Sequence, residues 1–356
     1  MNIVVKVGTQ SILSHDGTPF ESLMLHLVEQ IAQIQKAGHQ VVLVSSGAVS
    51  SGRKIASQTH GRQYGHSTGE KQLLASLGQH ELMRLYASMF KEHQILASQI
   101  LLTKQDFQTR QHYLNIARLL REILRQKNIV PIINENDSVA IEELMFTDND
   151  ELAGLIAAQM NVEQLIILSN VQGVYTAHPD EPGSEMISVI DPEQGWPEVS
   201  PVKSAHGRGG MSSKLATAQK MSGFGITTHI ASIEIPSVIT RIMNQEQLGT
   251  VILPSKKKSS IKKWIAYNNS KQTGFVIVNQ GLFDILKENQ RVISILPVGI
   301  VQSNGNFKKG DLVEIQTESG QKIGIGIAKY DAGKLNECLG QKDQPAFIHY
   351  DHLHIF

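Results

Sequence analysis

The stretch Ile129-Val130-Pro131-Ile132-Ile133-Asn134-Glu135-Asn136-Asp137 joins a short apolar run to a cluster of acidic and amide side chains. The run is rich in β-branched residues and predicts a buried strand. Polar groups at the carboxyl end of such a strand lie where open α/β sheets bind ligands. Asp and Asn together offer hydrogen-bond acceptors and donors, which suits a ligand that carries both an ammonium and a carboxylate group.

A second cluster of this kind, Asp148-Asn149-Asp150, follows a few residues later. Asn and Asp are also common turn residues, so either cluster alone is equally compatible with a turn. Two such clusters close together favour a ligand site.

Outward from this stretch, strand and helix patterns alternate over about the first 250 residues, as a parallel sheet with crossover helices requires. The helical patterns include 71–90, 113–124 and 152–160, and they separate strand-like runs at 3–7, 41–44, 100–102, 129–133, 165–168 and 226–230. We therefore expect an α/β fold, a three-layer α/β/α sandwich with a mainly parallel sheet.

The pattern of residue types changes after Pro254. Residues 255–263 contain five lysines and indicate a solvated basic linker. Beyond them, strand-like pieces at 275–278, 312–315 and 323–328 are separated by glycines and by turn signals such as Asn304-Gly305. The predicted domains are thus 1–254, the linker 255–263, and a small β-rich, barrel-like module at 264–356.

Composition narrows the class of protein. Lys+Arg 33 balances Asp+Glu 33, so no global field favours nucleic acid or an anionic membrane. Cys338 is the single cysteine, which excludes an internal disulfide and fits a reducing compartment. The start shows no signal-peptide pattern, and no apolar run approaches the roughly 18 residues that span a bilayer. We expect a soluble, cytoplasmic protein without a membrane partner.

Three further loops suggest phosphate chemistry. Lys6 lies inside a buried strand that ends in Val7-Gly8-Thr9, and such a lysine needs an anion or a nearby Asp as partner. The Ser- and Gly-rich stretch 45–52 suits anion binding at a helix N-terminus. In Gly207-Arg208-Gly209-Gly210-Met211-Ser212-Ser213-Lys214, Ser212 is a candidate N-cap and Lys214 a cation that opposes the helix dipole unless phosphate binds there. Lys6 and Lys214 are therefore candidates to flank a phosphoryl group.

These motifs together resemble the amino-acid kinase family, in particular its glutamate 5-kinases, whose bacterial members carry a C-terminal PUA domain. The resemblance covers essentially the whole chain. It rests on five motifs in the family's order: Val5-Lys6-Val7-Gly8-Thr9, Ser45-Ser46-Gly47-Ala48, Asn134-Glu135-Asn136-Asp137, Phe146-Thr147-Asp148-Asn149-Asp150 and Gly209-Gly210-Met211-Ser212-Ser213-Lys214.

The resemblance implies transfer of the ATP γ-phosphate, with Mg²⁺, to the side-chain carboxylate of L-glutamate, the first step of proline biosynthesis. Lys6 and Lys214 are then the expected catalytic residues. The implied glutamate site comprises Ser46, Gly47, Ala48, Asn134, Asp137 and Asn149, with Asp150 expected at the substrate amine. The implied nucleotide site comprises Lys6, Ser169, Asn170, Arg208, Gly209, Gly210, Met211, Ser212, Ser213 and Lys214. Feedback inhibition by proline and a homo-oligomer, dimer or tetramer, are further expectations.

Two other functions stay open. A non-catalytic sensor of glutamate or proline is favoured slightly by Ser169-Asn170, which stands where the family usually has Thr-Asp. Another kinase of the family with a different acceptor is expected to lack the paired acidic-amide clusters and the C-terminal module. PUA domains elsewhere bind RNA, but residues 264–356 hold nine Lys/Arg and nine Asp/Glu, so we do not expect RNA binding here.

Overall fold

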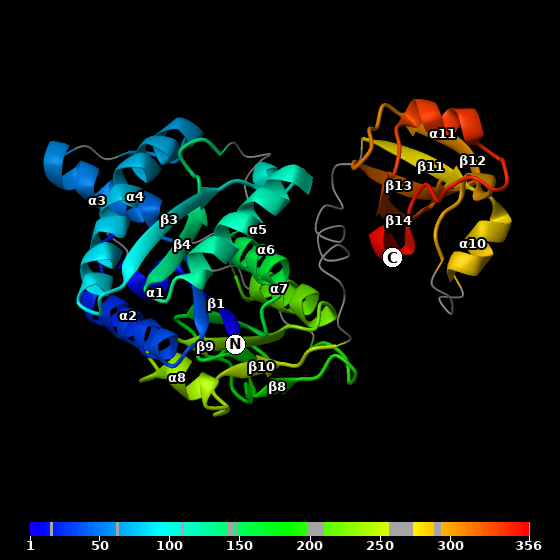
Figure 1. Cartoon of the computed structure of the whole chain (residues 1–356). Coiled ribbons are helices and arrows are strands. Elements are labelled where there is room, and N and C mark those ends of the chain that lie inside the picture. Colours follow the sequence, from blue (N-terminus) through cyan, green and yellow to red (C-terminus); the bar gives the residue numbers. More distant parts are fainter. Residues whose placement is uncertain are drawn as a thin grey trace. The chain divides into compact units, whose positions relative to one another are not determined.

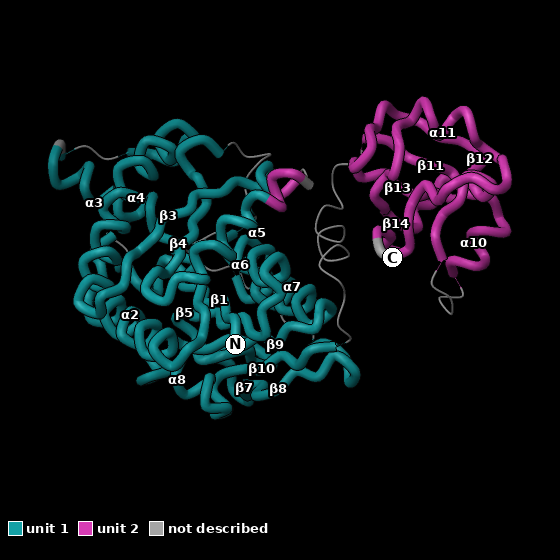
Figure 2. The backbone as a smooth tube through the Cα atoms, in the orientation of Figure 1, with its two compact units in different colours: residues 1–106, 115–257 teal, residues 107–114, 258–356 magenta. Residues whose placement is uncertain are grey.

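The computed structural model describes residues 1–14, 17–61, 64–108, 110–140, 146, 148–197, 210–255, 273–287 and 293–355. The chain falls into two compact units, one of residues 1–106 and 115–257 and one of residues 107–114 and 258–356 (Figure 2). Most of the predicted linker lies outside the described residues, so the domain boundaries stay a prediction.

The first unit is built on an eight-stranded sheet (Figure 1). Its strands are β3 Leu96–Leu102, β4 Ile129–Glu135, β2 Gln40–Ser45, β1 Asn2–Val7, β5 Gln164–Ser169, β9 Thr227–Ser232, β10 Thr250–Ile252 and β8 Val189–Ile190, in that spatial order. The first six run parallel, and β10 pairs antiparallel to β9. A separate hairpin joins β6 Val174–Tyr175 to β7 Met186–Ile187.

Helices alternate with these strands along the chain. They are α1 Thr9–Ile12, α2 Glu21–Lys36, α3 Ala48–His60, α4 Thr68–Lys91, the 3₁₀ helix η1 Lys104–Phe107, α5 Arg110–Arg125, α6 Asn149–Met160, α7 Met211–Gly223 and α8 Val238–Met243. The mainly parallel α/β sheet predicted from the alternating pattern is confirmed. All six predicted strands of this unit are present as β1, β2, β3, β4, β5 and β9.

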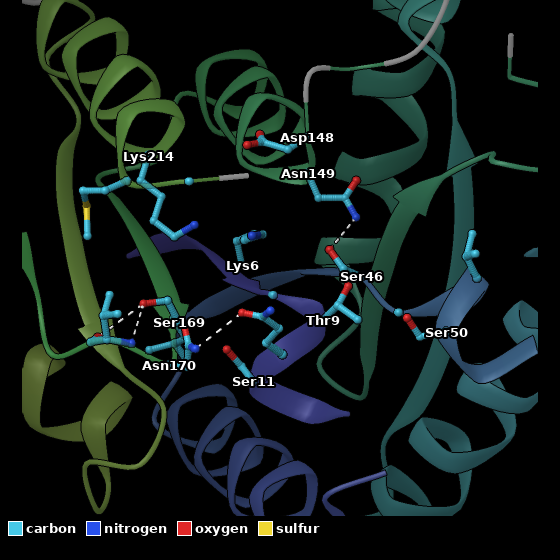
Figure 3. A pocket seen from close by; sticks show the side chains of 18 of the residues that line it. Lys6, Thr9, Ser11, Ser46, Ser50, Asp148, Asn149, Ser169, Asn170 and Lys214 are labelled. Atoms are coloured by element: carbon cyan, nitrogen blue, oxygen red, sulfur yellow. Dashed lines mark hydrogen bonds between the residues drawn. The ribbon is translucent and has the colours of Figure 1, made fainter. Parts of the chain in front are cut away.

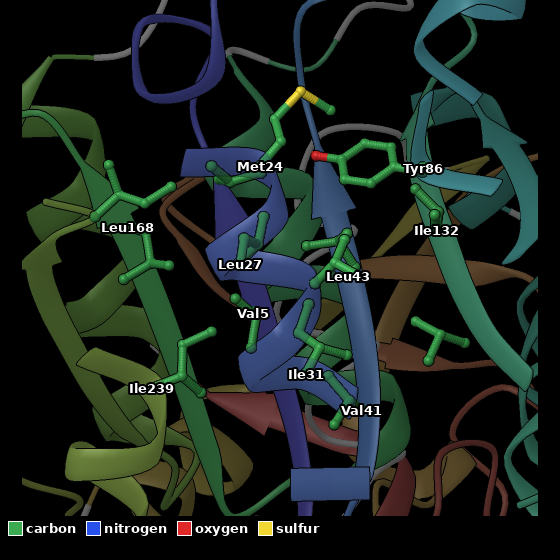
Figure 4. Close-up of a cluster of buried hydrophobic side chains, with 14 of the residues drawn as sticks. Val5, Met24, Leu27, Ile31, Val41, Leu43, Tyr86, Ile132, Leu168 and Ile239 are labelled. Carbon is green, nitrogen blue, oxygen red and sulfur yellow. The ribbon is translucent and has the colours of Figure 1, made fainter. Parts of the chain in front are cut away.

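Helices cover both faces of the sheet (Figure 1). One apolar cluster lies under α2, α4 and α8 (Figure 4). Val5 and Leu43 of the sheet pack there against Leu27 and Ile31 of α2. Successive side chains of a strand point to opposite faces. Lys6, next to Val5, therefore points to the other face, where α6 packs on β1. Strand alternation thus places a lysine between the sheet and α6.

The second unit contains a five-stranded sheet. The strands lie in the order β12 Ile300–Gly305, β11 Gly274–Val278, β13 Leu312–Thr317, β14 Lys322–Ile327 and β15 Leu353–Ile355. The described residues of this unit also include the helices α10 Gln280–Lys287 and α11 Ala332–Cys338 and the 3₁₀ turns η3 Pro297–Gly299 and η4 Tyr350–His352. Its core includes Phe307 and Phe347, with ring centroids 5.6 Å apart. The strand-rich character predicted for this region is confirmed. In the described part of the whole chain, no helix is long and apolar enough to cross a bilayer.

One buried histidine predicts an acid-sensitive fold. His229 lies on β9 between Ile166 and Val251 of the neighbouring strands, and neither ring nitrogen has a hydrogen-bond partner among the described residues. Burial lowers the pKa of His229 from 6.5 to about 4. As the pH falls, His229 is protonated in the unfolded chain before it is protonated in the folded protein. The free energy of unfolding is therefore unaffected by this histidine above pH 6.5 and decreases as the pH falls from 6.5 towards 4.

We expect this histidine to remove about 2 kcal/mol of unfolding free energy between pH 7 and pH 5. Urea unfolding of the wild type and of His229→Leu at both pH values measures the difference. The variant should lose about that much less stability on acidification. An equal loss in both proteins would show that His229 is not responsible.

Candidate active site

A cavity of about 970 Å³ opens at the carboxyl ends of the central strands (Figure 3). Asn134 of β4, Ser46 after β2, Lys6 of β1 and Ser169 of β5 all contribute to its wall. Because the sheet order is β4-β2-β1-β5 and neighbouring strands lie about 4.8 Å apart, these residues follow one another along the sheet edge. Lys6 therefore lies between the Asn134 and Ser46 side of the cavity and the Ser169 side.

Two lysines share one buried carboxylate at the centre of this edge. Lys6 Nζ lies 2.5 Å from Asp150 Oδ1, and Lys214 Nζ lies 3.0 Å from Asp150 Oδ2. Asp150 is fully enclosed, and the two lysines are 5% and 8% exposed. Burial alone raises the pKa of Asp150, but the two ammonium groups outweigh it and hold that pKa below its usual value. The carboxylate is therefore ionised and fixes both lysines.

The first turn of α6 sends three consecutive side chains in different directions. Asp148 caps the helix, because its Oδ1 accepts hydrogen bonds from the backbone N–H groups of Asp150 and Glu151. Asn149 points to the other side, where its Nδ2 donates to Ser46 Oγ at 2.7 Å and to Asn134 Oδ1 at 2.9 Å (Figure 3). Within the described chain, Asn149 Oδ1 has no hydrogen-bond partner.

Glycines let helices α3 and α4 pack closely against each other beside this site. Gly47, with φ of 112°, precedes α3, whose N-terminus has no side-chain cap. A Cβ on Gly52 would lie 1.8 Å from Leu74 O, and one on Gly78 would lie 1.8 Å from Ala48 O. The backbones of α3 and α4 are thus in contact. Ala48, the first residue of α3, lines the cavity.

The opposite side of the cavity is formed after β5 and before α7. Ser169 forms a local turn, with its Oγ accepting from Val171 N at 3.2 Å, and Asn170 Nδ2 donates to Gln10 Oε1 at 3.4 Å. Helix α7 begins at Met211 with Gly210 as N-cap and no side-chain cap. The prediction that Ser212 is the N-cap is therefore wrong, since the N-cap lies two residues earlier, at Gly210. Lys214 nevertheless lies near the helix start, as expected.

Most of the predicted site residues line this one cavity: Lys6, Ser46, Gly47, Ala48, Asn134, Asp137, Asn149, Ser169, Asn170, Gly210, Met211 and Lys214. Arg208 and Gly209 lie outside the described residues. Ser212 and Ser213 belong to α7 but do not line the cavity. Asp150 does not line it either, so its expected contact with the substrate amine is corrected: both of its oxygens face lysines.

The sequence analysis did not identify Arg53 and Lys71 of the cavity wall, and it gave no individual role to Glu135 and Asp148, which belong to the two predicted acidic-amide clusters. Burial raises the pKa of Asp148, and the nearby negative charge of Asp150 adds to that effect. Lys71 carried a readable signal, because Ser67 and Glu70 form a capping box that places it near a helix start. Arg53 carried no such signal.

The sequence profile of the amino acid kinase family matches residues 1–232. The chain belongs to the amino acid kinase family. A PUA domain profile matches residues 274–344, within the strand-rich second unit. The family resemblance of the five motifs is thereby confirmed.

Curated relatives place this amino acid kinase among the glutamate 5-kinases. The protein of that name from Chlorobaculum tepidum is 44% identical, over 99% of this chain and 97% of its own length. Those from Bacteroides thetaiotaomicron and Dictyoglomus thermophilum are 39% and 35% identical, over 99% and 96% of this chain and 98% and 91% of theirs. The similarity thus extends over both units.

Proposed function

We propose that this protein is an ATP-dependent kinase that phosphorylates the side-chain carboxylate of L-glutamate, giving L-glutamyl 5-phosphate for proline biosynthesis. The observation that carries the proposal is the pair of lysines, Lys6 and Lys214, held by Asp150 between the two sides of one cavity. The full-length similarity to glutamate 5-kinases supports the choice of acceptor.

The acceptor is assigned to the side of β2 and β4. Its ammonium group requires hydrogen-bond acceptors, and the proposed ones are the Asp137 carboxylate and the amide oxygen of Asn149, two residues that line the cavity. Ser46, Gly47, Ala48 and Asn134 complete this side. The nucleotide is assigned to the other side, with Ser169, Asn170 and the residues from Arg208 to Lys214, because the uncapped N-terminus of α7 suits a phosphate.

In the proposed reaction, an oxygen of the glutamate side-chain carboxylate attacks the γ-phosphorus while the bond to the ADP oxygen breaks. A carboxyl group with a pKa of about 4.3 is already ionised at neutral pH, so no general base is needed. Lys6 and Lys214 neutralise charge on the transferring group, and Asp150 is proposed to position them rather than to touch substrate.

Mg²⁺ is proposed as the companion of ATP. This ion is usually held by one or two carboxylates together with substrate phosphates. The Asp148 carboxylate lines the cavity beside the lysines, which fits that demand. No cluster of three or more His, Cys, Asp or Glu side chains that could hold a metal ion occurs in the described ranges. When bound, it would neutralise phosphate charge.

Replacing Lys214 with Ala should lower kcat by about 10²–10³-fold, because one of the two cations at the transferring group is lost. Steady-state kinetics with glutamate and MgATP measure the effect. Lys220→Ala, an exposed lysine of the same helix, is the matched control and should change kcat little. Unchanged turnover in Lys214→Ala would refute the assignment.

The proposed reaction is tested by ATP-dependent hydroxamate formation with hydroxylamine, which traps an acyl phosphate. The acceptor panel is L-glutamate, N-acetylglutamate and aspartate. Signal with glutamate alone supports the proposal, and signal with another acceptor supports a different kinase of the family. Silence with all three, in folded protein that still binds glutamate, would favour the sensor function instead.

Further proposals rest on the resemblance. We propose feedback inhibition by proline, a homo-oligomer, a cytoplasmic location and the domain division 1–254, 255–263 and 264–356. Light scattering at several concentrations tests the assembly, and proline titration of the kinase assay tests the inhibition.

A further inference from the structure

Lys71 is a cation of the cavity wall that the reaction above does not use. Lys6 and Lys214 are paired with Asp150, and Arg53 donates to the carbonyl oxygens of Tyr64 and Gly65. The side chain of Lys71, by contrast, has no hydrogen-bond or ion-pair partner within the ranges that the structure describes. It is therefore the lysine of this wall left with a full positive charge.

Its position in α4 adds a second reason to expect an anion there. Ser67 caps the helix, and the Glu70 carboxylate accepts from Gly65 N at 3.0 Å and from Ser67 Oγ at 2.6 Å. That carboxylate is therefore committed to the cap and does not pair with Lys71. A cation in the first helical turns opposes the helix dipole, which a bound anion would relieve. Lys214 occupies the equivalent position, four residues after the N-cap, in α7.

Helix α4 runs along the acceptor side of the cavity. Near its middle, Gln79 Oε1 accepts a hydrogen bond from Asn134 Nδ2 at 2.8 Å. Near its start, Gln72 Nε2 donates to the carbonyl oxygen of Ala140 at 3.3 Å. Lys71, the neighbour of Gln72, lines the same cavity as Asp137 of the segment 134–140. The proposed nucleotide side, which includes Ser169 at the end of β5, is separated from this acceptor side by Lys6 of β1.

Resting on the proposed function, we propose that Lys71 binds the α-carboxylate of L-glutamate. Glutamate carries two carboxylates and one ammonium group. The reacting carboxylate belongs at Lys6 and Lys214, and the ammonium group belongs at Asp137 and Asn149. The second carboxylate needs a cation on the same side of the cavity, and Lys71 supplies it. Lys71 is then a specificity residue, because it favours α-amino acids over amino acids that lack an α-carboxylate, such as 4-aminobutyrate.

Arg53 supports this role as a positioning residue. Its two hydrogen bonds to the backbone at Tyr64 and Gly65 hold the segment that enters α4. Gly65 N in turn donates to Glu70, so the start of the helix is fixed on both sides. The Lys71 side chain therefore extends from an anchored helix start into the cavity.

The test compares L-glutamate with 4-aminobutyrate, which keeps the ammonium group and the reacting carboxylate but lacks the α-carboxylate. In Lys71→Met, the Kd and KM for glutamate should rise on the order of 10- to 100-fold, as for loss of a charge-assisted hydrogen bond. kcat should stay within a few-fold, and the affinity for 4-aminobutyrate, measured by competition, should stay unchanged. Lys71→Arg should restore much of the preference for glutamate. Lys91→Met, an exposed lysine of the same helix, is the matched control.

Equal weakening of both ligands, or no weakening of glutamate, in Lys71→Met would overturn the proposal. If that variant does not fold, the same comparison with Lys71→Gln decides, with Lys71→Arg as its charged counterpart. Calorimetric glutamate binding without ATP separates this inference from the proposed function. A wild type that forms no acyl phosphate but binds glutamate through Lys71 would refute the kinase proposal alone.

Discussion

Asp150→Asn should nearly abolish activity and also weaken the fold. The amide keeps the shape of the side chain but removes the negative charge that two nearly buried lysines share. Removing one partner of a buried ion pair costs about 3–5 kcal/mol, because a charge is left uncompensated. The lysines then repel each other and leave the transferring group, so kcat should fall by about 10³-fold. Urea unfolding and steady-state kinetics measure the two effects.

Glu151→Gln is the matched control for this substitution. Glu151 is the next residue of α6, does not line the cavity, and pairs with the partly exposed Lys104. A pair of that kind contributes at most about 1 kcal/mol. The control should therefore behave like the wild type. Turnover within threefold of the wild type in Asp150→Asn would contradict the positioning role proposed for this carboxylate.

Gly78→Ala should push helices α3 and α4 apart next to the acceptor side of the cavity and so destabilise the protein. The new Cβ would lie 1.8 Å from Ala48 O and 2.3 Å from Gly52 N, and both of these are backbone atoms that no rotamer change can move. Inserting one carbon into a packed interface costs about 1–3 kcal/mol, and the close backbone contact puts this site at the upper end. Because Ala48 lines the cavity, the KM for glutamate should also rise. Thermal unfolding and glutamate titration measure these effects.

Gly69→Ala, in the same helix, separates packing from helix propensity. A Cβ at Gly69 meets nothing within 4 Å, so this change should stabilise the protein by up to about 1 kcal/mol. Opposite signs for the two substitutions are the expected result. A loss of stability in both would mean that the contact between α3 and α4 does not explain the glycine at position 78.

The central strands of the main sheet could be predicted from the sequence, but the strands β10 and β8 at one edge could not. β1 and β4 are continuous β-branched runs whose type follows from local pattern. β8 and β10, with two and three residues, are too short to show a period, and they exist because they pair with each other beside β9. Such strands are produced by tertiary contacts, so no local signal marks them.

The same limit applies to the site. The sequence predicted that Asp148, Asn149 and Asp150 form part of one site, and it could not predict their directions. Asp148, the extended N-cap residue, caps the helix. Asn149 and Asp150 follow as successive helical residues that point about 100° apart, so the first reaches Ser46 and the second meets the lysines. Which residue does which depends on how α6 is rotated against β1, and that is set by packing.

The carboxylate shared by Lys6 and Lys214 also affects product release, the last step of the catalytic cycle. The three groups together carry one net positive charge, not two. Two uncompensated ammonium groups would attract ATP, ADP and the acyl phosphate alike, and tight binding of every bound species slows release without lowering the barrier. A partly neutralised pair holds the products less tightly. We therefore expect the shared carboxylate to speed product departure as well as to aim the lysines.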